Sequence, residues 1–598
     1  MRGEVRFEHW RRIMRIRSLI WMVCLGALPV AASTIQTASS SVTQKPLSRA
    51  PLRAWIERFF QDIQTLQHVY LLQTTPVGQE VYRTYLTSWL SRLERVPDSL
   101  LRGDRGLDWM LLYGEVQQRL HALEDRLARD RAITKWIPGY WDIAKLEQNR
   151  RLKDWIQPEE AAAELSRLTD QIQKVRRELE SAKDKGPTLP QIKRALARMR
   201  EAKAWLTQWY RFRADYDPQF HWWVQTDAQR LQKALDAYLQ TLQQKLGTGP
   251  DAPLVGEPIG RERLLQSLRE QWLAYTPEEL IQIGEREFQW CERQLRQVSR
   301  KMGYGDDWKK ALSRIKQDHV APGKQPELIR QLAEDAIRFV QEHDLVTVPP
   351  LCRESWRIEM MPPAAQRITP YFTGGRTIRV AFPTIGMTYK EKQMALLSNN
   401  RHFAHATVLH ELIPGHWLQA YMAARYHPYR RYFSTPFYVE GWALYWEMKF
   451  WDLGYQKDPA DQLGALFWRL HRCARIIFSL KYHLGQMTAQ QAVDYLIQKV
   501  GHEPDQARAE VRRSIGGLYD PLYQAAYMIG ALQLRTLHDE LVNSGKMTEK
   551  QFHNAILRIG PIPIELIRHR LLNLPWSKDL KPQWRFYPLS KKDHQKKP

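Results

Sequence analysis

HELIPGHWLQ, residues 410–419, is the stretch that most constrains the fold, because it places two histidines and a glutamate close together. The zinc-binding helix of many hydrolases carries HExxH, in which a spacing of four residues puts both imidazoles on one helix face. Here His410 and His416 are six residues apart, which on an ideal helix is a rotation of about 600°, or roughly 120° away from a shared face. Pro414 interrupts the helical hydrogen bonds and Gly415 accepts a distorted backbone, so we expect a two-residue bulge that returns the second histidine to the metal.

A third metal ligand is expected downstream, because catalytic zinc keeps three protein ligands and one open position. In the segment YVEGWALYWE, residues 438–447, Glu440 opens an ExxA pattern on a predicted helix, as gluzincin-type zinc peptidases supply their glutamate. Glu447 lies on the same face, so it is either the neighbour of the ligand or its replacement. We favour Glu440. The motifs together predict one zinc ion per chain, held by His410, His416 and Glu440, although this ligand set also accepts other divalent ions.

The two segments resemble the HExxPGHxxQ and EGWALYxE motifs of the bacterial domain-of-unknown-function 885 (DUF885) family, whose members are regarded as candidate gluzincin-like zinc metallopeptidases. The similarity extends from about Gly260 to Trp576. Residues 474–488 are similar to the family's AxRLxxDxGLHxxGWT segment, and residues 513–530 to its RYxxxPGQAxxYxxG segment. The resemblance implies a large multi-helix scaffold with gluzincin-like metallopeptidase architecture.

The sequence departs from the family pattern at two places. Ser479 stands where the family has Asp, and Tyr523 stands where it has Gln, although Tyr527 and Gly530 match. These departures leave the metal motif intact. Because of them, the resemblance does not extend to the side chains around the metal ligands or to the substrate preference.

The motifs predict hydrolysis of a peptide bond by a metal-activated water, with Glu411 as the general base. A donor to the oxyanion is also required. Tyr527 is the first candidate, because helical zinc peptidases commonly place a Tyr or His there from a late helix. His483 and Arg475 are weaker candidates, and either could instead bind a substrate carboxylate. The predicted strand that contains Arg379 could pair with the backbone of an extended peptide at the cleft edge, which makes this residue a substrate-binding candidate.

Two further histidines, His402 and His405, precede the motif. Their spacings to His410 are eight and five residues, which suit no shared chelation on a regular helix. Each is either a group near the cleft or, as we favour, a structural side chain.

Helical periodicity predicts a mainly α fold. Leu, Ile, Ala and Trp recur at three- and four-residue steps over residues 47–246. Further on, Thr276, Thr488 and Thr548 begin patterns typical of capping boxes. The exception is TIRVAF, residues 377–382, whose alternation predicts a small β element before the motif helix.

Six segments follow from these patterns and from composition. The boundary inside the body is GTGPDAPLVGEPIG, because clustered Gly and Pro cannot continue a helix. In chain order the segments are a signal peptide (1–32), a flexible linker (33–46), an N-terminal helical region (47–246), a hinge (247–260), a metallopeptidase-like catalytic region (261–585) and a basic tail (586–598).

The N-terminal segment is typical of an export signal. A basic stretch ends at Arg17, and an apolar run from Leu19 to Ala32 ends in the small residues Val-Ala-Ala. The run is shorter than a bilayer span of about 20 residues. We expect cleavage near Ala32 and a periplasmic or extracellular location. An uncleaved anchor is the alternative.

The chain is strongly basic, with 89 Lys and Arg against 65 Asp and Glu, a net charge of +24. Such a charge favours nucleic acid, an anionic envelope or an acidic substrate. The sequence has no arginine-rich run, zinc finger or aromatic RNA-binding signature, so we expect no nucleic-acid partner. Weak association with an anionic envelope is expected, and the oligomeric state stays open.

Two alternatives to the peptidase stay open at this point. A zinc amidohydrolase would use the same metal and glutamate on a cell-wall amide or another non-peptide amide. A non-catalytic, metal-stabilised helical binding protein would use the metal only to hold its fold. The sequence leaves the choice between endopeptidase and exopeptidase undecided.

Overall fold

A computed structural model describes residues 52–182, 186–247, 252–366, 372–517 and 519–589. The predicted signal peptide and linker, and the last nine residues of the predicted basic tail, lie outside the described residues. Within the described part of the chain, no helix is both long enough and apolar enough to cross a membrane.

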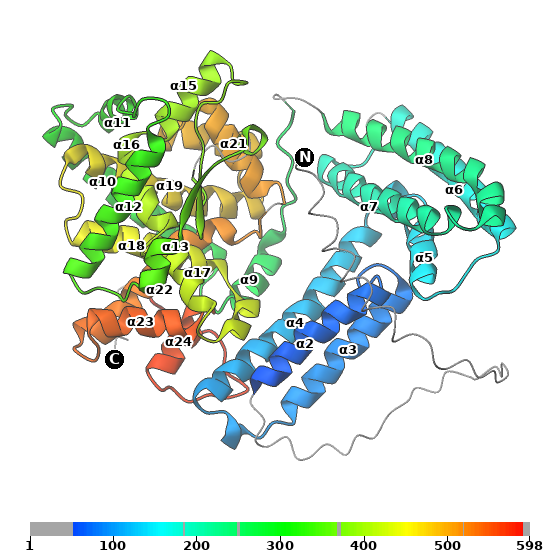
Figure 1. The fold of residues 1–598 in the computed structure, drawn as a ribbon, viewed down its shortest axis with the longest axis horizontal. Helices are drawn as coiled ribbons and strands as arrows, with labels where there is room; N and C mark the ends of the chain where they lie inside the picture. The colour runs from blue at the N-terminus through cyan, green and yellow to red at the C-terminus, as the bar shows by residue number, and fades with distance from the viewer. Residues whose placement is uncertain (1–51, 183–185, 248–251, 367–371, 518, 590–598) are drawn as a thin grey trace, which may run out of the picture. The chain divides into compact units, whose positions relative to one another are not determined.

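The described chain is mainly α-helical with one small sheet, which confirms the predicted fold class (Figure 1). The first helices are α2 (Leu52–Val69), α3 (Pro76–Glu94), α4 (Gly103–Arg131), α5 (Tyr140–Arg151), α6 (Pro158–Ser181), α7 (Leu189–Ala214) and α8 (Pro218–Leu246). The middle of the chain contains α9 (Gly260–Glu270), α10 (Pro277–Lys301), α11 (Trp308–Lys316), α12 (Gln325–Glu342), α13 (Pro350–Ser355), β1 (Arg357–Met360), α14 (Pro363–Gln366), β2 (Thr377–Val380) and α15 (Tyr389–Ser398). The remaining helices are α16 (Arg401–Glu411), α17 (His416–Ala423), α18 (Pro436–Asp452), α19 (Pro459–His483), α20 (Ala489–Tyr495), α21 (Pro504–Ile515), α22 (Tyr523–His538), α23 (Glu549–Ile559) and α24 (Ile564–Leu571).

Capping boxes begin three helices where the sequence predicts them. At α10 the backbone N–H of Thr276 donates to the Glu279 carboxylate at 2.8 Å, and the Glu279 N–H donates to the Thr276 hydroxyl at 3.2 Å. The same reciprocal pair forms at Thr488 before α20 and at Thr548 before α23. Each box satisfies backbone donors that have no partner inside the helix.

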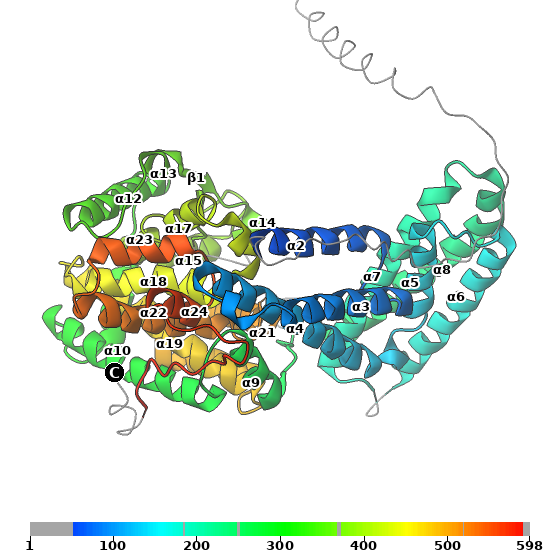
Figure 2. The ribbon, with the colours of Figure 1, turned by 90° about the horizontal axis from the view of Figure 1, so that it is seen from below.

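Two hydrophobic cores hold the described chain together. The larger core combines buried side chains of α2, α3 and α4 with those from Leu264 to Phe586. The smaller core lies between Ile133 and Leu242, where α6 and α7 both pack against α8 (Figures 1 and 2). The predicted N-terminal helical region 47–246 therefore contributes to two cores, and its first three helices pack with the region that follows.

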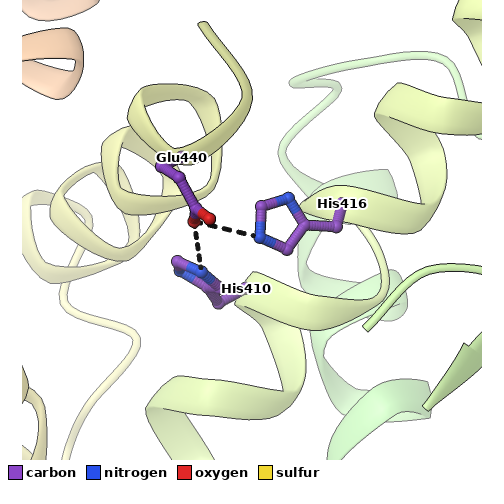
Figure 3. Close-up of side chains that lie close together, drawn as sticks. All are labelled: His410, His416 and Glu440. Atoms are coloured by element: carbon purple, nitrogen blue, oxygen red, sulfur yellow. Dashed lines mark ion pairs between the residues drawn. The ribbon is translucent and has the colours of Figure 1, made fainter. Parts of the chain in front are cut away.

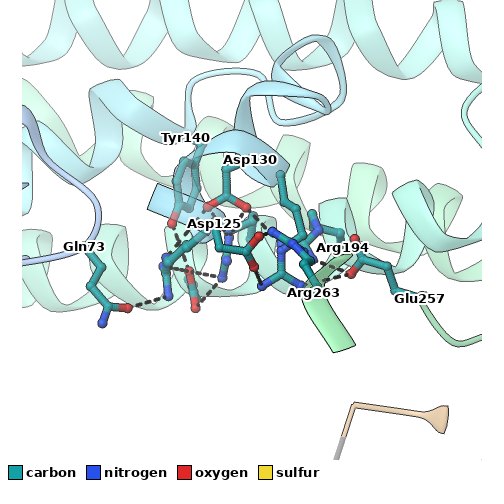
Figure 4. A network of polar contacts seen from close by, with 11 residues as sticks. Gln73, Asp125, Asp130, Tyr140, Arg194, Glu257 and Arg263 are labelled. Carbon is teal, nitrogen blue, oxygen red and sulfur yellow. Dashed lines mark hydrogen bonds and ion pairs between the residues drawn. The ribbon is translucent and has the colours of Figure 1, made fainter. Parts of the chain in front are cut away.

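A polar network ties α4, α7 and the segment before α9 together (Figure 4). Asp130, buried at the end of α4, accepts hydrogen bonds from Arg198 at 3.0 Å and from Arg194 at 3.4 Å. Arg194 also forms an ion pair with Glu257. Residues 252–260, the described part of the predicted hinge, are therefore attached to α7 by charge pairs.

β1 and β2 form a two-stranded parallel sheet that precedes the motif helix, as predicted. The alternation in β2 buries Ile378 and Val380 and exposes Arg379. On the other edge of β2, the Arg379 N–H donates to the Thr373 carbonyl at 2.8 Å, and the Thr373 N–H donates back to the Arg379 carbonyl at 3.1 Å. Thr373 thus pairs with the edge of β2 that β1 leaves open, as a bridge of a single residue.

The packed chain continues past residue 586, the predicted start of the basic tail. Phe586 is buried in the larger core. Tyr275 donates to the Tyr587 carbonyl at 3.1 Å, and Arg286 of α10 donates to the Pro588 carbonyl at 2.9 Å. The structure therefore attaches residues 586–589 to α10.

His553 of α23 is a buried neutral histidine, and it predicts acid sensitivity. Its Nδ1–H donates to the Leu345 carbonyl at 2.7 Å, and the Tyr445 hydroxyl donates to Nε2 at 2.8 Å. Burial lowers the pKa of His553 to about 3, whereas an unfolded histidine titrates near about 6.5. Below about pH 6.5 the unfolded chain binds a proton that the folded chain does not, so stability falls as pH falls. We expect this group to lower the free energy of unfolding by about 1.4 kcal/mol per pH unit between about pH 6 and 4.

The measurement is urea unfolding with chelator present at pH 7, 6 and 5, for the wild type and for His553→Gln. The glutamine cannot take up a proton. The free energy of unfolding of the variant should therefore change less steeply with pH, by the slope that corresponds to about one proton. Equal slopes in the two proteins would contradict the prediction.

Candidate metal centre

The HELIPGHWLQ segment consists of two helices rather than one bulged helix. α16 ends at Glu411, α17 begins at His416, and the four residues between them turn the chain. Leu412, the first residue of the turn, has φ −108° and ψ −103°, outside the helical region. The expected two-residue bulge is therefore wrong in form, because the helical hydrogen bonds stop and start again.

The turn depends on Gly415. Its N–H donates to the Leu409 carbonyl at 3.0 Å. A Cβ atom at this position would lie 1.9 Å from the His410 carbonyl oxygen and 2.5 Å from that of Leu409. The indole N–H of Trp442 on α18 donates to the Pro414 carbonyl at 2.9 Å. A residue without a side chain is thus needed for the chain to fold back on the end of α16.

The turn brings the three predicted ligands together (Figure 3). His410, His416 and Glu440 each offer one ligand atom, and these atoms lie within 4.8 Å of one another. Oε2 of Glu440 is 3.3 Å from Nε2 of His416 and 3.6 Å from Nε2 of His410. This oxygen is buried and has no hydrogen-bond partner among the described residues. A buried carboxylate oxygen without a donor is unfavourable, and a cation shared with two imidazole nitrogens would satisfy it. The residues therefore fit zinc.

Two of the predicted ligands, His410 and Glu440, are also held by side chains that contact them through the atom not facing the other ligands. Nδ1 of His410 donates to Glu447 at 2.7 Å, which leaves Nε2 free to bind a metal. Arg472 contacts the same Glu447 oxygen at 3.4 Å. The Tyr523 hydroxyl donates to Oε1 of Glu440. Of the two roles considered for Glu447, the structure supports that of neighbour: it orients His410, while Glu440 faces the centre.

α18 and α22 run side by side at very short range (Figures 1 and 2), because two glycines face each other. A Cβ on Gly441 would lie 2.6 Å from the Gly530 Cα, and a Cβ on Gly530 would lie 1.9 Å from the Phe437 carbonyl oxygen. This contact places Tyr523 and Tyr527 of α22 beside Glu440, the predicted ligand on α18.

A cavity of about 240 Å³ opens onto the three ligands. Its walls come from α16, α17, α18, α19, α21 and α22 and from residues 372–374. Of the predicted site residues, Glu411, Tyr527 and Arg475 line it together with the ligands. Burial raises the pKa of the Glu411 carboxyl and that of the Tyr527 hydroxyl above their ordinary values. Tyr527 is therefore a neutral hydroxyl donor at neutral pH.

Glu411 is held against the loop before β2. A Cβ on Gly374 would lie 2.1 Å from Oε2 of Glu411, and the Gly375 N–H donates to the Glu411 backbone carbonyl at 3.4 Å. The loop therefore fixes one side of the predicted general base, and only glycine leaves room for the carboxylate.

Three arginines, Arg472, Arg475 and Arg513, give one wall of the cavity a positive charge. Arg475 donates to Oε1 of Glu510 at 2.7 Å, and Arg513 lies 3.2 Å from Oε2 of the same carboxylate. Burial raises the pKa of Glu510, but the two arginines outweigh it and lower the value to about 2. The guanidinium of Arg475 lies 4.8 Å from the centre of the Tyr527 ring, and that of Arg472 lies 5.7 Å from it.

His483, predicted as a weaker catalytic candidate, is not among the residues that line the cavity. It ends α19, eight residues after Arg475, which is about 12 Å along the helix axis. Burial lowers the pKa of His483 to about 4, and neither ring nitrogen has a hydrogen-bond partner among the described residues. Of the two, only Arg475 lines the cavity.

Arg379, predicted to bind substrate, is also away from the cavity lining. Its side chain is 58% exposed and lies 3.5 Å from Glu359 on β1. Its backbone N–H and carbonyl both bond to Thr373, and β1 occupies the other edge of β2. The strand therefore offers no free backbone at Arg379 for a peptide, because the chain has paired both edges there.

His402 and His405 of α16 contact residues of α19 and of two loops. His402 contacts Asp461 at 2.7 Å through Nδ1 and Asp318 at 2.9 Å through Nε2. The His405 ring stacks on Tyr455, with ring centres 4.8 Å apart. Neither lines the cavity, which agrees with the favoured structural role.

Sequence reasoning missed Arg472, Arg513 and the part that Tyr523 plays. Signals for them exist in the spacing. Arg472 precedes Arg475 by one helical turn, and Tyr523 precedes Tyr527 by four residues, so each pair shares a helix face. Without the fold, nothing shows that these faces meet the metal ligands.

The geometry predicts that Gly415→Ala disrupts the metal centre. The added methyl group would overlap the His410 carbonyl, and we expect a loss of about 1–3 kcal/mol of stability together with reduced zinc retention. Gly114→Ala in α4 is the matched control, because a Cβ there meets nothing within 4 Å. The control should keep its zinc and gain about 0.5–1 kcal/mol. Zinc content after dialysis and urea unfolding check both, and full zinc retention in Gly415→Ala would contradict the prediction.

The chain is similar in fold to solved structures, of which two are described here. A protein of unknown function from Shewanella oneidensis, assigned as a lipoprotein, superposes with a TM-score of 0.66 at 17% identity, over 88% of this chain and 100% of its own. A protein from Colwellia psychrerythraea, also assigned as a lipoprotein, gives a TM-score of 0.57 at 15% identity, over 87% of this chain and 97% of its own. No curated protein matches the sequence.

The model of the family described as "Bacterial protein of unknown function (DUF885)" matches residues 69–571. The match begins well before Gly260, where the motif resemblance begins, so it includes most of the N-terminal helices. The chain belongs to the DUF885 family.

Proposed function

We propose that this protein is an exported, zinc-dependent hydrolase that cleaves peptide bonds. The observation that carries the proposal is the convergence of His410, His416 and Glu440, with an unsatisfied Glu440 oxygen at their centre and Glu411 in the same cavity. A site that served only to stabilise the fold would have no need of a cavity with a buried carboxylate beside the metal.

A zinc ion held there would supply Lewis acidity toward a carbonyl oxygen and would acidify a water molecule. Glu411 is the general base: it takes the proton of the attacking water and returns it to the leaving amine. Tyr527 donates a hydrogen bond to the oxygen of the tetrahedral intermediate. Glu447 and Tyr523 hold His410 and Glu440 in the orientations that the metal requires.

Export is part of this proposal. The N-terminal sequence has the pattern of a signal peptide, and the two solved structures described above are assigned as lipoproteins. Substrates would then be peptides outside the cytoplasm. A cell-wall amide is the alternative substrate, since the same metal and glutamate would serve.

The test compares Glu411→Gln with the surface control Glu359→Gln on β1. We expect the zinc-loaded wild type to hydrolyse members of a peptide library, and Glu411→Gln to lose about 10²- to 10⁴-fold in kcat/KM while it keeps one zinc per chain. The control should match the wild type. Hydrolysis that survives in Glu411→Gln would overturn the assignment of the general base.

The metal assignment is tested by His416→Ala beside His68→Ala, an exposed histidine on α2. We expect the first variant to lose its zinc, and with it any hydrolysis, because two ligands do not hold a catalytic ion. The second should retain both. If wild-type protein binds no zinc after the metal is supplied and the excess removed, the binding-protein alternative would lead.

A further inference from the structure

The arginine wall of the cavity, formed by Arg472, Arg475 and Arg513, has one positive charge more than the two carboxylates that it contacts, Glu447 and Glu510. Glu411 and Glu440 line the same cavity, and a zinc ion held there would balance their charges. Arg472 is paired with Glu447, which also accepts the Nδ1–H of His410. Arg475 and Arg513 face a single carboxylate, Glu510. Arg472, Arg475 and the two glutamates are buried, and Arg513 is half-buried. A buried surplus of positive charge is costly unless an anion joins it.

The guanidinium groups also keep unused donors. Arg475 reaches Glu510 through Nε, so the contact leaves its terminal NH₂ groups free to form a forked pair with another carboxylate. The buried Nε of Arg472 has no hydrogen-bond partner among the described residues. Arg513 faces Glu510 through its Nε, which leaves the terminal NH₂ groups of Arg513 outside that ion pair. All three arginines line the cavity. The wall therefore presents charge and donors that a carboxylate would satisfy.

The distance from this wall to the metal ligands is short. The Tyr527 ring centre lies 6.4 Å from the His410 ring centre, and the Arg475 guanidinium lies 4.8 Å from the Tyr527 ring centre. These contacts set an upper limit of about 11 Å between the guanidinium and the ligand ring. An extended chain spans about 3.3–3.6 Å per residue, so at most about three residues fit between a scissile bond and a carboxylate at the arginines.

The size of the cavity points the same way. Its volume of about 240 Å³ lies below the roughly 300–1,000 Å³ of ordinary ligand pockets. Such a space accommodates the end of a peptide better than a chain that passes through. The end that matches arginine donors is the carboxylate, not the amine.

We propose that the arginine wall binds the free C-terminal carboxylate of the substrate and that the protein is a carboxy-terminal exopeptidase, releasing one to three residues. This rests on the proposed function. Water adds its oxygen to the scissile carbonyl carbon, the C–N bond breaks, and the proton held by Glu411 passes to the amine of the released C-terminal fragment. Arg475 and Arg513 hold the carboxylate of that fragment and thereby set the position of cleavage.

The test uses two peptides of one sequence, both acetylated at the N-terminus, one with a free C-terminal carboxylate and one with a carboxamide. With the zinc-loaded full chain we expect kcat/KM to be about 10- to 100-fold higher for the free acid, the usual range for a charge-assisted pair. Mass spectrometry should show fragments of one to three residues from the C-terminus. Equal rates, or cleavage in the interior, would overturn the proposal and leave the hydrolase standing.

Arg513→Met tests whether the arginine wall causes the preference for a free C-terminal carboxylate. Its loss leaves Arg475 paired one to one with Glu510, so the acid-to-amide ratio should fall toward one. Arg512→Met, an exposed neighbour on α21, is the matched control and should keep the wild-type ratio. If Arg513→Met does not fold, Arg513→Lys retains the charge without the fork and should give an intermediate ratio. If the Arg513 variant that folds keeps the wild-type acid-to-amide ratio, the proposal is overturned.

Failure of the proposed hydrolase function can be distinguished from failure of the carboxylate site. If neither peptide is hydrolysed, the binding of both to zinc-loaded Glu411→Gln is measured by calorimetry. Binding of the free acid about 10- to 100-fold tighter than the amide, and lost with Arg513→Met, would support the carboxylate site without the hydrolase. Equal binding would overturn the carboxylate site as well.

Discussion

The fold of the metal centre depends on the contact between the backbone of Gly415 and the carbonyl groups that end α16. That contact lets the chain leave one helix and start another within four residues. It converts a spacing of six residues, which no regular helix could use, into two imidazoles that face one carboxylate. The hydrogen bond from Trp442 to the Pro414 carbonyl connects the turn to the helix that supplies Glu440.

A second close contact builds the other half of the site. Gly441 and Gly530 let α18 and α22 approach until backbone meets backbone. Tyr523 then reaches Glu440, and Tyr527 lines the cavity. Both helix pairs thus use glycine in the same way, because the side chains of the candidate site come together only where two backbones approach more closely than any side chain allows.

Buried charge is arranged in matched groups around the cavity. Glu447 lies between His410 and Arg472, and Glu510 lies between Arg475 and Arg513. Such groups hold their geometry because an unpaired charge in the interior is strongly unfavourable. The same constraint makes the two exceptions informative: the orphan oxygen of Glu440 indicates a cation, and the surplus of the arginine wall indicates an anion.

The sequence by itself determined the mainly helical class, the capped helix starts, the small β element, the family and the three residues of the candidate metal site. These depend on periodicity, turn chemistry and a local motif, all of which act over a few residues. Only the tertiary structure decided how the motif closes, which of Glu440 and Glu447 faces the centre, and that His483 and Arg379 lie elsewhere. It also brought Arg513 and Tyr523 to the site from distant positions in the chain. Their places follow from helix packing, where backbone contacts between residues far apart in the sequence set distances that no local spacing encodes.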